Sequence, residues 1–415
     1  MMKTITFSDL VEINPRVQLN KSEEYPFVEM SVVEPGNRYV RPNQTRIYNG
    51  GGAKFMPGDI LFARITPCLE NGKIAQYIYN KAIAGFGSTE FFVFRARPKI
   101  SNPGFVFYLV NSEIIRKPAE KNMSGASGRQ RADLKSIVNI KIPFTALPTQ
   151  RKIASILSAY DDLIENNLRR IKILEEMAQN LYHEWFIKFR FPGHENTRFV
   201  NSPLGRIPEG WEIGKLGDIS HVTTGYAFKS KDWSKDGIAV IKIKNIKPGN
   251  LVDVDQVDHV PKNIISSRLQ KYWLKNGDII IAMTGATAGK VGKIRSKKPL
   301  LLNQRVAKIG PKSGYVKFVW CTMSTPEAEK RFYALADGAA QPNMSSTQIE
   351  NSEVIIPLTD LLKQFEETVS PLIDSVDNMI LKNQILRQTR DLLLPKLISG
   401  EVDVTDIEIP ETIEV

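Results

Sequence analysis

The 415-residue chain has only two cysteines and four histidines, and this scarcity excludes several kinds of site. Cys68 and Cys321 lie far apart with no CxxC pair, which excludes a cysteine-rich zinc site and is typical of a reducing cytosol. The histidines are scattered without the spacing of metal ligands. No run of 18 apolar residues is present, and residues 1–15 contain no apolar signal core. We therefore expect a cytoplasmic protein without a membrane span.

Motifs of common enzymes are also missing. The glycine-rich segment at residues 285–292 has one residue too few for a phosphate-binding loop and has Val291 where a Ser or Thr is needed. Residues 85–90 lack the third glycine of a dinucleotide motif. Residues 14–16 and 102–104 each begin with Asn-Pro but lack the second proline and the aromatic residue that follow in an adenine-methylating motif. No HExxH or GxSxG motif is present, so we predict no catalytic, cofactor-binding or metal-binding residue.

The composition is that of a soluble protein with an excess of positive charge. The chain is 42% hydrophobic and 24% charged, and its length indicates two or three domains. Its 56 Lys and Arg against 45 Asp and Glu give a net charge of +11. This balance favours a polyanionic partner, nucleic acid first, although many basic proteins bind no polyanion.

Two long stretches, residues 147–191 and 358–400, repeat apolar residues at alternating steps of three and four. This heptad pattern predicts two helices, each a rod of roughly 60 Å, that pair as a coiled coil. The alternative is two amphipathic helices in ordinary cores. The predicted seam comprises Ile153, Leu157, Tyr160, Ile164, Asn167, Ile171, Leu174, Leu181, Phe365, Val369, Leu372, Val376, Met379, Asn383, Leu386 and Leu393.

Several polar residues and prolines interrupt this apolar helical pattern. Asn167 and Asn383 place polar groups in the seam, where such residues fix register, and Arg390 occupies one seam position. Pro371 and Pro395 are expected to kink or end the second helix. Four carboxylates of the first helix are expected on its outer faces, either in solvent or facing a partner. These carboxylates are Asp161, Asp162, Glu175 and Glu176.

The whole chain is an internal repeat. Short matches, such as Gly58–Leu61 with Gly277–Ile280, recur in order at an offset between 209 and 219. We therefore expect an α+β protein with two β-rich domains related by a pseudo-two-fold axis and separated by an antiparallel coiled coil. The expected parts are a first β-rich domain at 1–146, a long helix at 147–191, a linker at 192–210, a second β-rich domain at 211–357, a second long helix at 358–400 and an acidic tail at 401–415.

Alternating and β-branched runs between turn residues predict the strands of each copy. The expected strands are residues 27–33, 59–65, 73–79 and 90–95, followed by a helix or helix pair at 103–122, and in the second copy residues 239–246, 278–283, 291–295 and 304–309, followed by a helix at 316–336.

Several phrases resemble the specificity subunit of type I restriction–modification systems. They are residues 147–167, 181–193, 203–219 and 392–402, and the resemblance covers essentially the whole chain. It implies that each β-rich domain is a target recognition domain that reads one half of a bipartite DNA target through the major groove. It also implies that the coiled coil sets the spacing between the halves and docks two modification subunits, which methylate adenine N6.

The resemblance further implies that this chain is not an enzyme and binds no cofactor. S-adenosylmethionine, ATP and magnesium would belong to the modification and restriction subunits of a bacterial or archaeal complex. Two other hypotheses remain: a fused methyltransferase or nuclease, and a coiled-coil scaffold that binds only proteins. Modification or cleavage of DNA by the chain alone would favour the first alternative. A steep loss of DNA affinity with rising salt, measured with the partners present, would argue against the second.

Polar residues in loops and at strand ends are the predicted DNA contacts. For each one, a surface or turn-stabilising role is an equally good interpretation. The predicted residues are Arg64, Thr66, Lys73, Ser88, Thr89, Arg129, Gln130 and Arg131 in the first domain, and Thr284, Thr287, Lys290, Asn303, Gln304, Arg305, Gln341 and Asn343 in the second.

Overall fold

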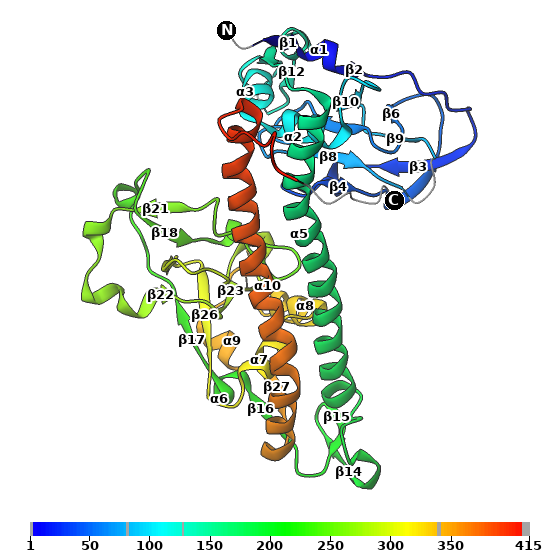
Figure 1. The fold of residues 1–415 in the computed structure, drawn as a ribbon. Helices are drawn as coiled ribbons and strands as arrows, with labels where there is room; N and C mark the ends of the chain where they lie inside the picture. The colour runs from blue at the N-terminus through cyan, green and yellow to red at the C-terminus, as the bar shows by residue number, and fades with distance from the viewer. Residues whose placement is uncertain (1–2, 80–82, 127, 338–341, 409–415) are drawn as a thin grey trace. The chain divides into compact units, whose positions relative to one another are not determined.

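The computed structural model describes residues 3–79, 83–126, 128–337 and 342–408 (Figure 1). The chain forms two compact units, and the boundaries between them fall inside both long helices. The first unit comprises residues 1–166 and 383–415, and the second comprises residues 167–382. Each unit therefore contains one β-rich domain with part of each long helix, which confirms the α+β class.

The first unit is built on two sheets. Its larger sheet has the strand order β2-β10-β7-β8-β4, and the second has the order β5-β3-β9-β6. The bounds are β2 Val11–Ile13, β3 Glu24–Val28, β4 Tyr39–Val40, β5 Gln44–Ile47, β6 Ala53–Phe55, β7 Ile60–Ala63, β8 Ile74–Tyr77, β9 Gly85–Gly87 and β10 Phe91–Ala96. The minor pairs are β1 Thr4–Thr6 with β13 Lys141–Pro143, and β11 Met123–Ser124 with β12 Arg131–Ala132.

The second unit has two four-stranded sheets, ordered β17-β26-β23-β24 and β21-β18-β25-β22. The bounds are β17 Ser220–Thr224, β18 Ile238–Ile241, β21 Asp258–Val260, β22 Trp273–Leu274, β23 Ile279–Ala282, β24 Val291–Lys293, β25 Leu300–Leu302 and β26 Val306–Pro311. The minor pairs are β14 Phe199–Ser202 with β15 Gly205–Pro208, β16 Glu212–Lys215 with β27 Glu353–Ile356, and β19 Ile246–Lys247 with β20 Leu251–Val252.

The two units repeat one sheet plan, which confirms the duplication. The order β2-β10-β7-β8 in the first unit matches β17-β26-β23-β24 in the second, with antiparallel pairing throughout. Each second sheet contains one parallel pair, β3 with β9 and β18 with β25. The central strands β7 and β23 are buried on both faces, as their uninterrupted apolar sequences ILFA and IIIA require.

Most predicted strands are confirmed, and two were placed too long: the strand expected at 239–246 ends at Ile241 and is followed by a 3₁₀ turn at Ile243–Asn245, and the strand expected at 27–33 ends early in the same way. Strand β3 ends at Val28, and residues 30–32 form a 3₁₀ turn where the sequence was expected to continue as a strand. Each domain also contains a helix pair beside its sheets; the pair was expected as one alternative at 103–122, whereas the single helix expected at 316–336 is divided into two. The helices are α1 Phe7–Leu10, α2 Pro103–Asn111, α3 Glu113–Lys121 and α4 Lys135–Val138 in the first unit, and α6 Leu216–Ile219, α7 Val316–Met323, α8 Pro326–Ala334 and α9 Ser346–Glu350 in the second.

The long helices are α5 (Leu147–Tyr182) and α10 (Thr359–Ser399). In the first unit, the start of α5 pairs with the end of α10, since Asp161 contacts Arg390 and the Ile164 carbonyl accepts a 3.5 Å bond from Asn383. Later residues of α5 contact earlier residues of α10, so the two helices run antiparallel in this unit (Figure 1).

In the second unit, the end of α5 pairs with the start of α10 in the same antiparallel sense. The π-helical turn at His183–Ile187 extends α5, and its Trp185 ring lies 5.8 Å from that of Phe365. Every predicted seam residue is buried or partly buried within its own unit. The coiled-coil interpretation is therefore favoured over two independent amphipathic helices.

Four expectations about these segments need correction. Neither Pro371 nor Pro395 ends α10, because the buried stripe packs on both sides of each exposed proline; a kink at either residue stays a prediction. Asp161 is not on a solvated face; it is buried in its unit. Residues 192–210, expected as a linker, contain the β14–β15 hairpin, whose Ile207 is buried. Within the tail, Val404 packs into the core of the first unit.

Candidate nucleic-acid interface

The predicted contact residues of the first domain meet where the central strand β7 ends. The backbone N–H of Arg64 donates to the Glu90 carbonyl at 2.9 Å, and the Arg64 carbonyl accepts from Ala132 at 2.7 Å. One residue further, the N–H of Thr66 donates to the Gln130 carbonyl at 2.9 Å. Three segments distant in sequence, residues 64–66, 88–90 and 130–132, therefore form one junction, which we call the first junction.

The second domain builds the same junction after strand β23. Met283 takes the place of Arg64: its N–H donates to the Arg305 carbonyl at 3.0 Å, and its carbonyl accepts from Met344 at 2.8 Å. The N–H of Gly285 then donates to the Pro342 carbonyl at 2.8 Å. Residues 283–285, 303–305 and 342–344 form this second junction.

The matching hydrogen bonds align the two sets of predicted residues one with another. Ser88 corresponds to Asn303, because their N–H groups donate to the equivalent residues Val28 and Ile241. Lys73 and Lys290 likewise correspond, since their carbonyls accept from the last residues of β7 and β23. By the same alignment, Thr89 matches Gln304, Glu90 matches Arg305, and Arg131 matches Asn343.

The first junction carries a cluster of charge centred on a carboxylate. Glu90 accepts from Arg131 through Nε at 2.9 and 3.0 Å and through Nη2 at 2.6 Å, and from Arg64 Nε at 3.2 Å. The Arg131 and Arg64 guanidinium groups hold the pKa of Glu90 below its ordinary value. The cluster keeps one net positive charge, so it remains attractive to a phosphate-rich partner.

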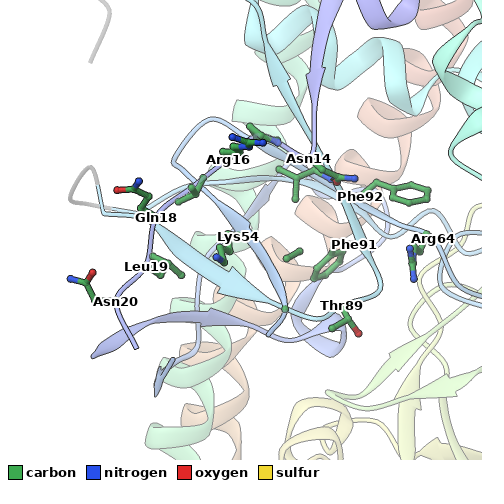
Figure 2. A pocket seen from close by; sticks show the side chains of 15 residues that line it. Asn14, Arg16, Gln18, Leu19, Asn20, Lys54, Arg64, Thr89, Phe91 and Phe92 are labelled. Carbon is green, nitrogen blue, oxygen red and sulfur yellow. The ribbon is translucent and has the colours of Figure 1, made fainter. Parts of the chain in front are cut away.

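A surface hollow of about 810 Å³ lies beside this junction in the first unit. Arg16, Lys54 and Arg64 line it, together with the amide side chains of Gln18 and Asn20, and the described lining residues include no Asp or Glu. Figure 2 shows these side chains, with Arg64 and Thr89 at one side of the hollow and Gln18, Leu19 and Asn20 at the other. A basic hollow with several amide groups suits both phosphates and base edges.

The loop of residues 14–20 was not among the predicted contacts. It is positioned by Asn14, whose N–H donates to the Val93 carbonyl at 2.7 Å and whose Oδ1 accepts from the Val93 N–H at 2.9 Å. Asn14 adopts a positive φ of 49°, a conformation that Asn tolerates better than most residues. An Asn-Pro pair after a strand was the available signal, but a sequence motif for methylation was the only role it suggested.

The predicted residues divide into exposed and buried groups. Thr66, Thr284 and Asn303 are buried, contrary to the expectation of side chains open to a partner. The Thr66 hydroxyl oxygen accepts from the Gln130 N–H within the first junction. Lys73 uses its ammonium group on the Met30 carbonyl at 2.8 Å. Gln341 lies outside the described residues. The exposed or partly exposed side chains are Arg64, Ser88, Thr89, Arg129, Gln130, Arg131, Thr287, Lys290, Gln304, Arg305 and Asn343.

The described part of the chain contains neither a candidate metal site nor a candidate membrane-spanning helix. There, no group of three or more His, Cys, Asp or Glu residues is arranged to hold a metal ion. Among the described helices, none has the length and apolar character needed to cross a membrane.

Comparisons with known proteins agree with the duplicated plan. The family model for the type I restriction modification DNA specificity domain matches residues 2–176 and again residues 208–387. The MjaIX specificity subunit of Methanocaldococcus jannaschii is 28% identical over 73% of this chain and 70% of its own length. The EcoAI specificity subunit of Escherichia coli is 25% identical over 90% of this chain and 77% of its own length.

A solved structure shares the fold. The type I restriction-modification S subunit from M. genitalium superposes with a TM-score of 0.55 at 16% identity, over 96% of each chain. Both halves of the chain match the family model, and the match spans most of its length. The chain therefore belongs to the type I restriction modification DNA specificity family.

Proposed function

We propose that this specificity subunit reads a DNA target in two halves, one with each junction. The observation that carries the proposal is the duplicated junction itself. The same hydrogen-bonded scaffold presents different side chains in the two domains, Glu90 and Arg131 in one, Arg305 and Asn343 in the other. A constant backbone with variable polar side chains is suited to reading two different base sequences in the major groove.

The paired helices would set the distance between the halves. Two half-sites on the same face of B-DNA lie about 34 Å, one helical turn, apart. A protein that requires a fixed gap between the half-sites therefore needs a stiff spacer between its two recognition domains. Antiparallel pairing of α5 with α10 within each unit supports this role. Asn167 and Asn383, polar seam residues buried in their respective units, are suited to fixing the register on which such a gap depends.

The chemistry would belong to partner subunits. Two modification subunits would dock on the helical region and supply the S-adenosylmethionine site for adenine N6 methylation. Restriction subunits would supply ATP hydrolysis, magnesium and cleavage. This chain would contribute recognition, with no catalytic residue and no cofactor of its own.

The test is an exchange of domains in the assembled methyltransferase, read out by mapping methylated adenines. Replacing residues 1–146 with the corresponding domain of another family member should change one half of the target and leave the other half unchanged. Inserting seven residues into each long helix should lengthen the gap without changing either half. A chimera that keeps the original target and gap contradicts the proposal. Methylation or cleavage by the chain alone would show that it is an enzyme.

A further inference from the structure

The backbone at Arg131 is fixed by hydrogen bonds, although its side chain is exposed. The residues on both sides of it are fixed: the Gln130 N–H donates to Thr66 Oγ1 at 3.0 Å, and the Ala132 N–H donates to the Arg64 carbonyl at 2.7 Å. Arg131 itself forms a β-bridge with Ile65. The Cα position and direction of this side chain are therefore set by the end of the central strand rather than by a free loop.

The Glu90 carboxylate accepts hydrogen bonds from one edge of the Arg131 guanidinium. All three bonds involve Nε and Nη2, and the structure records no hydrogen bond from Nη1 within the described residues. Of the five N–H donors of an arginine, the pair on the Nη1–Nη2 edge is thus left facing away from the carboxylate. The Arg131 side chain is 48% exposed and that of Glu90 only 18%, so the carboxylate lies beneath and the guanidinium above.

A carboxylate is a costly residue to place at a surface that binds DNA. It repels phosphates, and it cancels one of the two positive charges of Arg64 and Arg131, so it lowers general affinity. In return, the carboxylate orients the arginine. A guanidinium that is already held by two or more hydrogen bonds loses less conformational freedom when it binds DNA. A residue that reduces general affinity while fixing one donor pair is suited to discrimination between sequences.

The free edge of Arg131 matches one base. Two parallel N–H donors complement the O6 and N7 acceptors that guanine alone presents in the major groove. The second junction has different side chains at the two equivalent positions: Arg305 replaces the carboxylate, and Asn343 replaces the arginine. At this position of the junction, a carboxylate-held arginine is therefore present in the first domain and is not a general requirement of the scaffold.

We propose that Glu90 is a positioning residue that holds Arg131 side-on, so that the free edge of Arg131 reads a guanine in the first half of the DNA target. This inference rests on the proposed function, and it adds the residue pair and the base.

The experiment uses the assembled methyltransferase and a panel of targets in which each base pair of either half is replaced in turn. In the wild-type complex, one position of the first half should require G·C. Glu90→Ala and Arg131→Ala should each reduce that preference by about tenfold or more, leaving the other positions of both halves unchanged. The double variant should be no worse at this position than Arg131→Ala alone, because Glu90 acts only through Arg131.

Two controls distinguish positioning by Glu90 from a general loss of charge or of folding. Glu113→Gln removes a carboxylate from an exposed pair with Lys117 on α3 in the same unit and should leave every preference unchanged. Should Glu90→Ala fail to fold, Glu90→Gln keeps the size of the side chain and should relax the same position. Unchanged discrimination in the second half shows that the complex is assembled.

Other results would overturn the inference. A Glu90 variant that lowers methylation equally on all targets would show a purely structural role. One that raises affinity for all DNA and keeps the preference would show that Glu90 only limits general binding. Loss of preference at a position that is not guanine would reject the base assignment. Failure of the domain exchange at residues 1–146, in contrast, would reject the proposed function itself.

Discussion

Arg390 on α10 donates a hydrogen bond to the Asp161 carboxylate on α5, and the Tyr108 hydroxyl donates to the other oxygen of the same carboxylate. The side chains of Arg390 and Asp161 are only 10% and 3% exposed. Burial raises the pKa of Tyr108, with the neighbouring Asp161 charge adding to the effect, so this hydroxyl keeps its proton and remains a donor. The cluster joins both long helices to the α2 helix of the first unit.

Asp161→Asn should destabilise the first unit by about 3 kcal/mol, because it removes the buried counter-charge of Arg390 and leaves only the exposed Asp391 carboxylate, 2.9 Å away, as its ionic partner. Tyr108→Phe removes one neutral donor and should cost about 1 kcal/mol. Hydrogen exchange of the core amides of the first unit, in the full chain, measures both changes. Lys117→Met, at the exposed pair of Lys117 with Glu113 in the same unit, is the control and should cost under about 0.5 kcal/mol. An Asp161→Asn variant as stable as this control would contradict the prediction.

The duplication supplies a matched comparison at Asp59 and Asp278, which follow the same glycine turn. Asp59 accepts two 2.7 Å bonds from Arg95 and a third from the Met56 N–H, also at 2.7 Å. Asp278 accepts the equivalent backbone bond from Lys275 at 2.9 Å, but its cation, Lys308, lies 3.7 Å away. The two sites thus share a turn and differ in the ion pair.

Asp59→Asn should therefore cost more than Asp278→Asn, about 3 kcal/mol against about 1 kcal/mol, since only Asp59 loses a bidentate pair. Hydrogen exchange resolves the two effects within one chain, because each substitution should loosen its own unit. Equal losses would show that the turn, and not the arginine, determines the stability of this site.

Glu366 gives a prediction for the dependence of stability on pH. Burial raises the pKa of Glu366, and the N–H groups of Phe318 and Lys317, each donating at 2.8 Å, partly oppose the shift. The folded protein therefore binds this proton more tightly than the unfolded chain does. The contribution of Glu366 to stability is greatest below the unfolded value near 4.5 and is lost as the pH rises through the raised folded value.

Glu366→Gln should consequently make the second unit more stable at pH 7 and give no such advantage below pH 4.5. The first unit offers a precedent, because Gln150 accepts the Asn102 N–H at 2.9 Å beside the corresponding helix α2. Denaturant unfolding of the wild type and the variant between acid and neutral pH provides the measurement. A variant less stable than the wild type at pH 7 would show that the carboxylate charge helps the start of α7.

The sequence predicted the features that local patterns encode. A heptad repeat is local, so the seam from Ile153 to Leu393 could be identified without knowing which segments meet. The duplication likewise placed exposed polar residues such as Arg131 and Asn343 at the ends of the correct strands. These predictions needed only spacing and composition.

Contacts between distant residues could not be predicted in this way. Asp161 was expected in solvent because its partner Arg390 lies 229 positions away. Glu90 was not among the predicted residues, because nothing local in the sequence marks its pairing with Arg131, 41 positions along the chain. The hollow depends on Asn14 pairing with Val93, 79 positions along the chain, and no periodic pattern marks its loop. In each case the tertiary structure gave a polar residue its partner.

Arg16 on that loop provides a test of how the hollow meets DNA. It is exposed and lines the hollow beside Gln18, at some distance in the chain from either junction (Figure 2). A cation so placed is suited to a phosphate contact, which carries affinity without sequence information. Arg16→Ala should therefore weaken binding of the assembled complex to target and unrelated DNA by the same factor.

The salt dependence of binding distinguishes this role from base reading. Removing one phosphate contact should reduce the slope of log affinity against log salt by about one, because one fewer counterion is released. Titrations of the complex at several salt concentrations provide the slope. Lys117→Ala is the matched control, since Lys117 lies on α3 with its charge paired to Glu113 at 2.5 Å, and its slope should not change. If Arg16→Ala instead lowers affinity only for the target and leaves the slope intact, Arg16 reads a base, and the phosphate contacts of the first domain must come from other cations such as Lys54.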